Sequence, residues 1–403
     1  MSNIKLVSIP DKEYTSYKYD LIFNAYKWDP QVEDHNTVSK YVVLIDRKTR
    51  EELKRYAEEL SKETIMIENY LSKNLNLIKD LNLPKKCVRE LNNISNYKEE
   101  EHIRLMRFDF HPTEKGWAIS EVNSDVPGGL SEASLWPKLA NKYFKDYEPS
   151  EDVSKILLKE FKSKLNDNST VAFVHATSYS DDRQVMQFLG DYFDKFEFNT
   201  LYLAPDHIKW KDNKAYSILE GNECEIDGIF RFFPLEWLNN LPRKSGRFGY
   251  YSSKTLSCNH PISLFAQTKR LPLIWDKLDF EVPTWKKLLP ATKKINEIPF
   301  DKDKWVYKPA LGRVGEGIYI EEALSIKEMK DIKKDIKKHP KEWIMQEKFK
   351  SKPVITEDNK EYHLCMGVFT VNSKFAGYYA RVSEFPRIDG RAKDIPVLVE
   401  KGD

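Results

Sequence analysis

Two strand-like runs that carry charged side chains at every second position limit the fold of this chain more than any other feature. They lie within residues 103–124 and are joined by a turn that contains proline and glycine. Arg107 and Asp109 alternate along the first run. Glu121 and Asn123 alternate along the second. We predict that the runs pair as an antiparallel hairpin, which gathers an arginine, two carboxylates and an amide on one face.

The residues after the second run, SDVPGG, end the strand and allow the backbone to pass close to a bound group. Asp125 would extend the polar row if the strand ran on. Oxygen ligands on one face of a strand suit a hard cation such as Mg²⁺. Phosphates and water then complete the coordination shell of the ion. Two plainer interpretations compete. Arg107 and Asp109 could form a surface ion pair worth at most about 1 kcal/mol, and Glu121 with Asn123 could be a polar strand face.

The composition excludes several classes of protein. In 403 residues, 65 Lys and Arg side chains nearly balance 63 Asp and Glu side chains, so charge favours neither nucleic acid nor an anionic membrane as partner. No apolar run reaches bilayer length, and the N-terminus lacks the apolar core of a secretion signal. Four widely spaced cysteines suit reduced thiols. We expect a cytoplasmic protein of two or three subdomains around a shared cleft; its oligomeric state stays open.

The order of the predicted elements favours an α+β fold. Residues 48–82 carry apolar side chains three or four apart, which predicts an amphipathic helix or helix pair. Residues 169–204 read as strand, helix and strand, with Ser180 or Asp181 as the helix cap. Residues 304–322 read as a strand, a glycine-rich loop and a return strand. Helices dominate the early chain, and an antiparallel-rich region closes it.

The phrase YKPALGRVGEGI has the chemistry of a phosphate site. Lys308 ends an apolar strand, where its ammonium can reach a phosphate, and the amides of the glycine-rich loop can fold over phosphate oxygens. A strand follows this loop, whereas a helix follows the loop of a Walker A motif or of a dinucleotide fingerprint, so the phrase is neither of these. The alternative interpretation is a plain hairpin turn. Further along, Gln346 and Glu347 end a strand as a hinge at an adenine edge would. The loop glycines are Gly312, Gly315 and Gly317.

Together these features resemble the ATP-grasp superfamily, and their order resembles the glutathionylspermidine synthetase family. In that family the cation site lies on an earlier hairpin, as RFDF and SEVNSD do here. FRFFPLEWL, TKRLPLIWDKL, YKPALGRVGEG, and Arg381 with DIPVLVE resemble further phrases of the family in the same order. The likeness spans residues 100–400, and the early KWDPQ also reads like family members.

The resemblance implies a role for each candidate residue. Mg²⁺ would be bound by Asp109, Glu121 and Asn123. ATP phosphates would be held by Lys269 and Lys308 under the glycine loop, with Gln346 and Glu347 bordering the adenine. The transferred phosphoryl group would be stabilised by Arg107 and Arg381. Asp394 stands, after a one-residue gap, where the family presents an acid to a polyamine.

The resemblance also implies an architecture: an ATP-grasp fold with a preceding α/β subdomain and a helical N-terminal region. The chain would divide into four parts. These are a helical N-terminal region that packs on the synthetase core (1–100), a metal-site hairpin with the following helix (101–150), an α/β pre-ATP-grasp subdomain (151–260) and an ATP-grasp nucleotide-binding region (261–403). The sequence carries no separate amidase domain of the kind fused to some relatives. Val126 and Gly128 stand where the resembling enzymes place hydroxyl residues against glutathione, which puts glutathione as substrate in question.

These expectations combine into an ATP- and Mg²⁺-dependent carboxylate–amine ligase that works through an acyl-phosphate. The acid is a small molecule or peptide, and the amine is unspecified, with a polyamine suggested by the family alone. Two other classes stay open: a kinase-like phosphotransferase, which keeps the phosphate on its product, and a nucleotide-binding protein with little turnover.

Several other polar residues have simpler interpretations. Asp181 and its neighbours Asp182 and Arg183 could touch substrate, but helix capping explains the acids. His175 follows a buried strand and is expected to satisfy a backbone group. His363 and Cys365 alternate on a strand, but two residues do not make a metal site. The lysines within residues 327–341 are most simply the polar face of a solvated helix.

Overall fold

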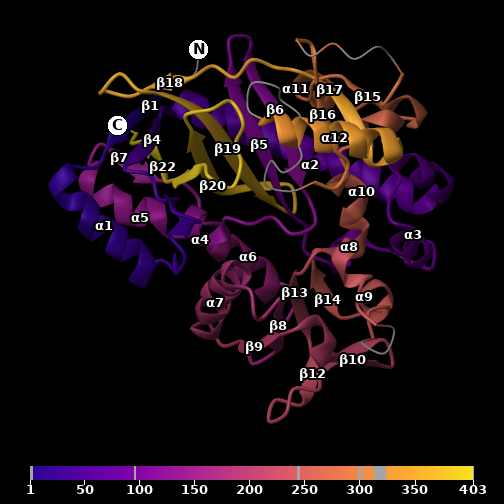
Figure 1. Cartoon of the computed structure of the whole chain (residues 1–403). Coiled ribbons are helices and arrows are strands. Elements are labelled where there is room, and N and C mark those ends of the chain that lie inside the picture. The colour runs from indigo at the N-terminus through magenta and orange to yellow at the C-terminus, as the bar shows by residue number, and fades with distance from the viewer. Residues whose placement is uncertain are drawn as a thin grey trace.

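The computed structural model describes residues 3–94, 97–242, 246–297, 301, 303–312 and 324–402. Helices and antiparallel sheets are mixed along the chain, which confirms the predicted α+β class. At the centre lies an antiparallel sheet in the order β21-β20-β19-β5-β6, with β18 paired to β19 (Figure 1). Its strands are β5 (Leu105–Thr113), β6 (Gly116–Asn123), β18 (Val354–Ile355), β19 (Glu361–Val371), β20 (Lys374–Ser383) and β21 (Lys393–Ile395).

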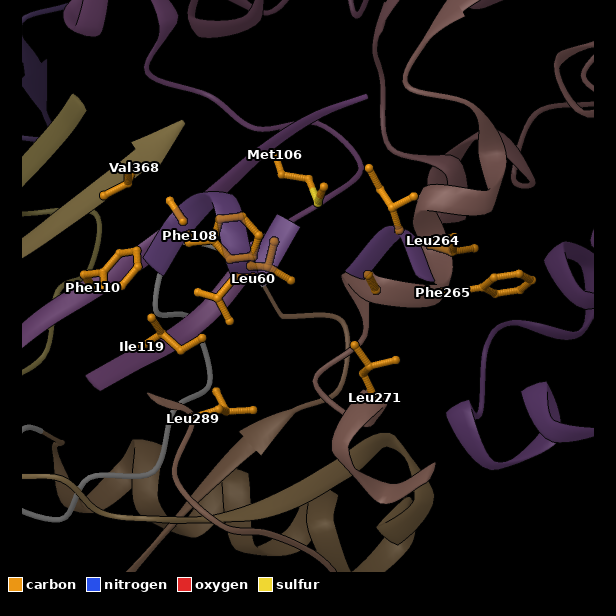
Figure 2. Packing of buried hydrophobic residues seen from close by; sticks show 14 of the residues in the cluster. Leu60, Met106, Phe108, Phe110, Ile119, Leu264, Phe265, Leu271, Leu289 and Val368 are labelled. Carbon is orange, nitrogen blue, oxygen red and sulfur yellow. The ribbon is translucent and has the colours of Figure 1, made fainter. Parts of the chain in front are cut away.

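One face of this sheet is apolar and packs on α2 (Arg47–Lys73). Phe108 and Phe110 of β5 are fully buried, and Figure 2 shows them beside Leu60 of α2. Because side chains alternate along a strand, the intervening residues of β5 must face the other way. The helix itself matches the predicted periodicity, and η1 (Leu75–Leu81) follows it. Asp46 caps it by accepting a hydrogen bond from the Thr49 N–H at 2.7 Å.

A second sheet has parallel strands in the order β14-β13-β8-β9 and lies in the lower part of Figure 1. Its elements are β8 (Thr170–His175), β9 (Asn199–Leu203), β13 (Gly228–Phe232) and β14 (Leu256–Cys258), with α6 (Val153–Lys162) and α7 (Ser180–Asp194). The predicted strand, helix and strand are therefore present. The predicted cap was wrong, because Tyr179 holds the N-cap position of α7 without a side-chain cap hydrogen bond. The antiparallel strands β10 (Ile208–Lys211), β11 (Lys214–Ser217) and β12 (Cys224–Ile226) form a small sheet of their own.

A third sheet joins the two ends of the chain in the order β1-β4-β22-β7. Its strands are β1 (Ile4–Ser8), β4 (Tyr41–Ile45), β7 (Tyr147–Pro149) and β22 (Val397–Glu400). The N-terminal segment therefore contributes strands as well as helices. The helices α1 (Asp11–Asn24) and α5 (Trp136–Ala140) supply Tyr17, Leu21 and Trp136 to a core that also contains Val42 and Leu398 of this sheet.

A fourth sheet, β15-β17-β16, carries the nucleotide candidates and lies with α12 at the upper right of Figure 1. Its elements are β15 (Thr292–Lys294), β16 (Trp305–Pro309), β17 (Trp343–Glu347) and α12 (Ile326–Lys338). Only Ile336 is buried in α12, as the solvated-helix interpretation of its lysines requires. Gly315, Gly317 and the predicted return strand lie outside the described residues.

Short elements connect these sheets. They are β2 (Gln31–Val32), β3 (His35–Asn36), α3 (Lys85–Leu91), α4 (Leu130–Ser134), α8 (Leu235–Leu238), α9 (Gly249–Ser252), α10 (Leu264–Gln267), η7 (Leu271–Lys277) and α11 (Pro283–Leu288). Pro272 lies in the first turn of η7, and residues 268–270 separate η7 from α10, which ends at Gln267. In the described part of the chain, no helix combines the length and the apolar character that crossing a bilayer requires.

Candidate active site

The second face of the central sheet holds the residues of the predicted hairpin site, which form a polar region beside the apolar Leu105, Phe369 and Val371. Arg107 lies opposite Asn123, and Asp109 lies opposite Glu121, in the register of β5 with β6. The register shifts after Asp109, so Ser120 is the extra residue between the paired segments. Directly opposite side chains on one face are the closest neighbours that a sheet offers. The predicted juxtaposition is therefore confirmed.

Arg107 and Asp109 form a buried, two-pronged ion pair. Arg107 donates from Nε to Asp109 Oδ1 at 2.8 Å and from Nη2 to Oδ2 at 3.0 Å. Their side chains are only 12% and 10% exposed, so the surface-pair interpretation was wrong. Burial alone would lower the pKa of Arg107, but the Asp109 carboxylate more than offsets it and raises that pKa. Asn123 adds an N–H donor to Asp109 Oδ2 at 3.0 Å.

Three glycines and a tyrosine shape the space around the Arg107 guanidinium. A Cβ at Gly367 would lie 2.7 Å from Cδ of Arg107, so a glycine there leaves the space that the arginine fills. The guanidinium carbon lies 4.8 Å from the ring centre of Tyr379, a cation–π contact. Gly129 has φ of +88°, and a Cβ on it would lie 2.6 Å from the Tyr379 ring. Gly128 accepts a hydrogen bond from Arg107 Nη1 at 2.7 Å, so the PGG turn shapes this pocket.

Asp125 does not extend the polar row, because the strand ends at Asn123. Its side chain is fully buried and accepts from Arg231 of β13 and from the Leu235 N–H at 3.0 Å. The acid therefore ties the hairpin to the parallel sheet. A buried carboxylate needs such partners, since leaving one unpaired costs several kcal/mol, on the order of 3–5.

Two lysines from distant segments converge on Glu121. Lys269, which follows α10, places Nζ 2.7 Å from Glu121 Oε2 and 2.7 Å from the Gly312 carbonyl oxygen. Lys308 on β16 donates to Gln346 Oε1 at 2.6 Å and to the Ser120 carbonyl at 3.3 Å. Both ammoniums thus lie at the edge of the hairpin that the sequence predicted.

The charges of this group are strongly coupled. Burial would raise the pKa of Glu121, but Lys269, Lys308 and Arg107 together lower it, so the carboxylate is ionised. Burial lowers the pKa of Lys308 to about 8; Glu121 opposes this fall and Lys269 adds to it. An anion placed beside this ammonium would stabilise its charged form and raise its pKa.

The two predicted hinge residues have different surroundings. Gln346 is buried, accepts from Lys308 and donates to Thr292 Oγ1 at 3.2 Å. Glu347 ends β17, where its N–H donates to the Ala291 carbonyl at 2.8 Å, and alternation turns its side chain to the other face. A small pocket opens beside Gln346. Its walls include Glu121, Lys269, Leu271, Trp285 and Leu289.

Arg381 and Asp394 lie at the far end of the same polar face. They are opposite one another in the β20–β21 pair, and Arg381 Nε lies 3.7 Å from Asp394 Oδ1. Arg381 also donates to the carbonyl oxygens of Asp389 and Ala392. Asp394 accepts from the Tyr379 hydroxyl at 2.7 Å and from Lys27 Nζ at 2.8 Å.

The comparisons with known proteins identify the family of this chain. The family model described as "Glutathionylspermidine synthase preATP-grasp" matches residues 12–400. The chain belongs to this family. A Haemophilus influenzae protein named "Putative acid--amine ligase" is 25% identical over 238 residues, which cover 56% of this chain and 57% of that relative. Among solved structures, a glutathione synthetase-like effector from Globodera pallida in its apo form shares the fold, with a TM-score of 0.62, 11% identity and 98% of each chain covered.

The donor set on the hairpin fits a magnesium ion that is held together with phosphates. Asp109, Glu121 and Asn123 offer oxygen atoms on one face, and Glu121 is ionised. Among the described residues, no three His, Cys, Asp or Glu side chains gather as a metal site. Three protein ligands would leave part of the octahedral shell of Mg²⁺ to phosphates and water, as is usual where it binds with a nucleotide.

Sequence reasoning missed Tyr379, Lys27 and Glu132. Tyr379 lies two residues before Arg381, so the period of the strand could have placed it on the polar face. Lys27 belongs to the KWDPQ phrase, which the resemblance marked without assigning a role. Glu132 lies in α4, just after the PGG turn, and only the packing shows that it faces Lys27.

The remaining candidates do not join the site as ligands. His175 places Nδ1 3.1 Å from the Phe173 carbonyl oxygen, so it satisfies the backbone as expected. Cys365 lies opposite Arg381 in the β19–β20 pair, and burial raises the pKa of its thiol well above the usual range. A thiol that stays protonated is a poor nucleophile and a poor metal ligand.

Proposed function

We propose that this protein is an ATP- and Mg²⁺-dependent carboxylate–amine ligase with an ATP-grasp nucleotide site. The observation that carries the proposal is the convergence of Lys269 and Lys308 on Glu121, next to the buried Arg107–Asp109 pair. Three cations and two carboxylates leave one excess positive charge among these side chains, which suits a polyphosphate with its metal ion. The name of the Haemophilus influenzae relative supports the same reaction class.

The nucleotide would lie between the fourth sheet and the hairpin. Lys269 and Lys308 would bind the phosphates. The pocket beside Gln346 has an apolar wall that suits a purine ring, lined by Leu271, Trp285 and Leu289. Gln346 and Glu347 would border the adenine.

The hairpin would hold the metal ion and the transferred phosphoryl group. Asp109, Glu121 and Asn123 would bind Mg²⁺, which neutralises phosphate charge when bound. Arg107 and Arg381 would stabilise the charge that spreads over the equatorial oxygens in the transition state. Arg107 is already fixed by Asp109, Gly128 and Tyr379, so little reorganisation is needed.

The reaction has two steps. A carboxylate oxygen of the acid attacks the terminal phosphorus of ATP, which forms an acyl-phosphate and releases ADP. The neutral nitrogen of the amine then attacks the acyl carbon, phosphate leaves, and the nitrogen loses a proton to form the amide. The closed site would exclude the water that hydrolyses the acyl-phosphate.

We extend the proposal to the division of the chain. The nucleotide-binding region would be 261–403, the pre-ATP-grasp subdomain 151–260, the metal-site hairpin with its helix 101–150, and the N-terminal region 1–100. Because the central sheet pairs β5 with β19, the hairpin and the C-terminal region would act as one catalytic body.

The test is ADP release from Mg-ATP by purified protein, scanned over pairs of carboxylates and amines, with Glu121→Gln as the blank. The carboxylates would include glutathione, short peptides and amino acids, and the amines would include amino acids, monoamines, diamines and spermidine. The proposal expects ADP release only when both the carboxylate and the amine are present, and it expects mass spectrometry to detect the amide product. Phosphate that stays on an acceptor would instead identify a phosphotransferase. Nucleotide binding without turnover for every pair would favour a binding protein.

A further inference from the structure

A lysine ammonium lies buried beside the proposed reaction centre. Lys27 follows α1, and its Nζ lies 2.8 Å from Asp394 Oδ2 and 3.5 Å from Glu132 Oε1. The side chains of these three residues are between 8% and 10% exposed. Nζ also lies 5.9 Å from the ring centre of Trp136. The ammonium is thus held by two carboxylates and an aromatic ring, which are the groups that proteins use to bind a cationic ligand.

Two side chains, Asp394 and Tyr379, link this ammonium to the arginine proposed to bind the phosphoryl group. The Tyr379 hydroxyl donates to Asp394 Oδ1 at 2.7 Å, and the ring of the same tyrosine carries the Arg107 guanidinium. Asp394 is also opposite Arg381 across the β20–β21 pair. The Lys27 ammonium therefore lies at the end of the polar face opposite the ATP lysines, where the acceptor must approach the acyl group.

The charges of this end are already balanced without a ligand. Lys27 and Arg381 face Asp394 and Glu132 there. The charge of Asp181 also acts on Lys27, but the Asp181 side chain is exposed, so water screens this interaction. Both oxygens of Asp394 are engaged, one by Lys27 and one by Tyr379. A second ammonium could bind here only by displacing Lys27.

We propose that Lys27 determines the amine specificity of this enzyme, because its ammonium fills the cation subsite next to the reaction centre. The acceptor is then an amine that brings only its reacting nitrogen to this end of the site, such as a monoamine or an amino acid, and not a diamine or polyamine. This inference rests on the proposed ligase function. In this proposal Asp394 binds the Lys27 ammonium of the protein itself, and not the ammonium of a polyamine substrate.

The first test measures whether an amine binds in the space that the Lys27 ammonium occupies, and it does not depend on enzyme activity. Lys27→Ala leaves two buried carboxylates around an empty space, so the variant should unfold at a lower temperature than the parent protein. Ethylamine or 1,4-diaminobutane at millimolar concentration should raise its melting temperature by about 2 °C or more, with NaCl of equal ionic strength having no such effect. The parent and Lys12→Ala, which alters an exposed lysine of α1, should be stabilised less than Lys27→Ala by the same amines. No stabilisation of Lys27→Ala by either amine would overturn the inference.

The second test measures selectivity. The ratio of kcat/KM for 1,4-diaminobutane to kcat/KM for ethylamine should rise about tenfold or more in Lys27→Ala. If that variant fails to fold, Lys27→Met is used, and its affinity for 1,4-diaminobutane by calorimetry should exceed that of the parent by a similar factor. An unchanged ratio or affinity would contradict the inference. The two proposals fail separately: amine-specific stabilisation without amide formation for any pair would reject only the ligase, and amide formation with no diamine effect would reject only the role of Lys27.

Discussion

The two ends of the polar face of the central sheet hold charge in opposite ways. At the nucleotide end, Lys269 and Lys308 act on the single carboxylate of Glu121, and burial lowers the pKa of Lys308 to about 8. At the other end, Lys27 and Arg381 are matched by Asp394 and Glu132. Arg107 lies between them, paired with Asp109 and stacked on Tyr379. The difference indicates that the first end has an excess of positive charge that an anion can neutralise. At the second end the charges of the side chains already neutralise one another.

The largest effect is expected from removing the carboxylate that organises the nucleotide end. Glu121→Gln removes a proposed metal ligand and the negative charge beside Lys269 and Lys308, so amide formation should fall by a factor on the order of 10² to 10³ or more. Circular dichroism should show an intact fold. The matched control is Glu114→Gln, at the exposed turn of the same hairpin. A fully active Glu121→Gln protein would reject the metal assignment.

The next largest effect is expected at the centre of the face. Gly367→Ala would place a Cβ 2.7 Å from Arg107 Cδ and so displace the guanidinium. A misplacement of this size should lower kcat by about tenfold to 100-fold while leaving ATP affinity nearly unchanged. Gly390→Ala, where a Cβ meets no atom within 4 Å, is the control. An equal loss in both variants, or a loss of ATP affinity alone, would contradict the role of Arg107 in phosphoryl transfer.

A smaller effect is expected from removing one phosphate ligand. Lys308→Met should weaken ATP binding by about tenfold or more, because a charge-assisted hydrogen bond is lost. Titration calorimetry with Mg-ATP measures this. Lys304→Met, on the exposed approach to the same strand, should bind normally. Unchanged affinity in Lys308→Met would place the nucleotide elsewhere.

The smallest effect is a change with pH. The Lys308 pKa of about 8 means that the ammonium is charged below that pH and neutral above it. ATP affinity should therefore fall by up to about tenfold between about pH 7 and pH 9, with a proton taken up on binding near pH 8. Calorimetry in buffers of different ionisation enthalpy detects the uptake. The same proton uptake in Lys308→Met would assign it to another group.

Local patterns predicted the parts of the site that lie within one supersecondary unit. The alternation of Arg107 with Asp109, and of Glu121 with Asn123, was sufficient to predict that these side chains meet on one face of a hairpin, because a strand has a fixed period. It did not predict the shift in register after Asp109. The pairing of Lys269 and Lys308 with this hairpin depends on tertiary packing, and only the family resemblance indicated it. Local rules also failed where packing prevailed, as at Asp125, which turns toward Arg231.

The acceptor end could not be predicted from the sequence. Lys27 and Asp394 are 367 positions apart, and no local period links them. Their contact follows from the third sheet, where β22 pairs with β4 and brings the two ends of the chain together. The cap predicted at Ser180 or Asp181 was wrong because both residues lie inside the first turn of α7, and Tyr179 holds the N-cap position.

The central claim is that a carboxylate is activated by phosphorylation on this polar face. The most direct measurement uses the acid identified by the ADP-release scan, labelled with ¹⁸O in its carboxylate, and follows the label by mass spectrometry. An acyl-phosphate predicts that one ¹⁸O atom of the acid appears in the released phosphate for each amide formed. Amide formation with phosphate free of the label would contradict the mechanism.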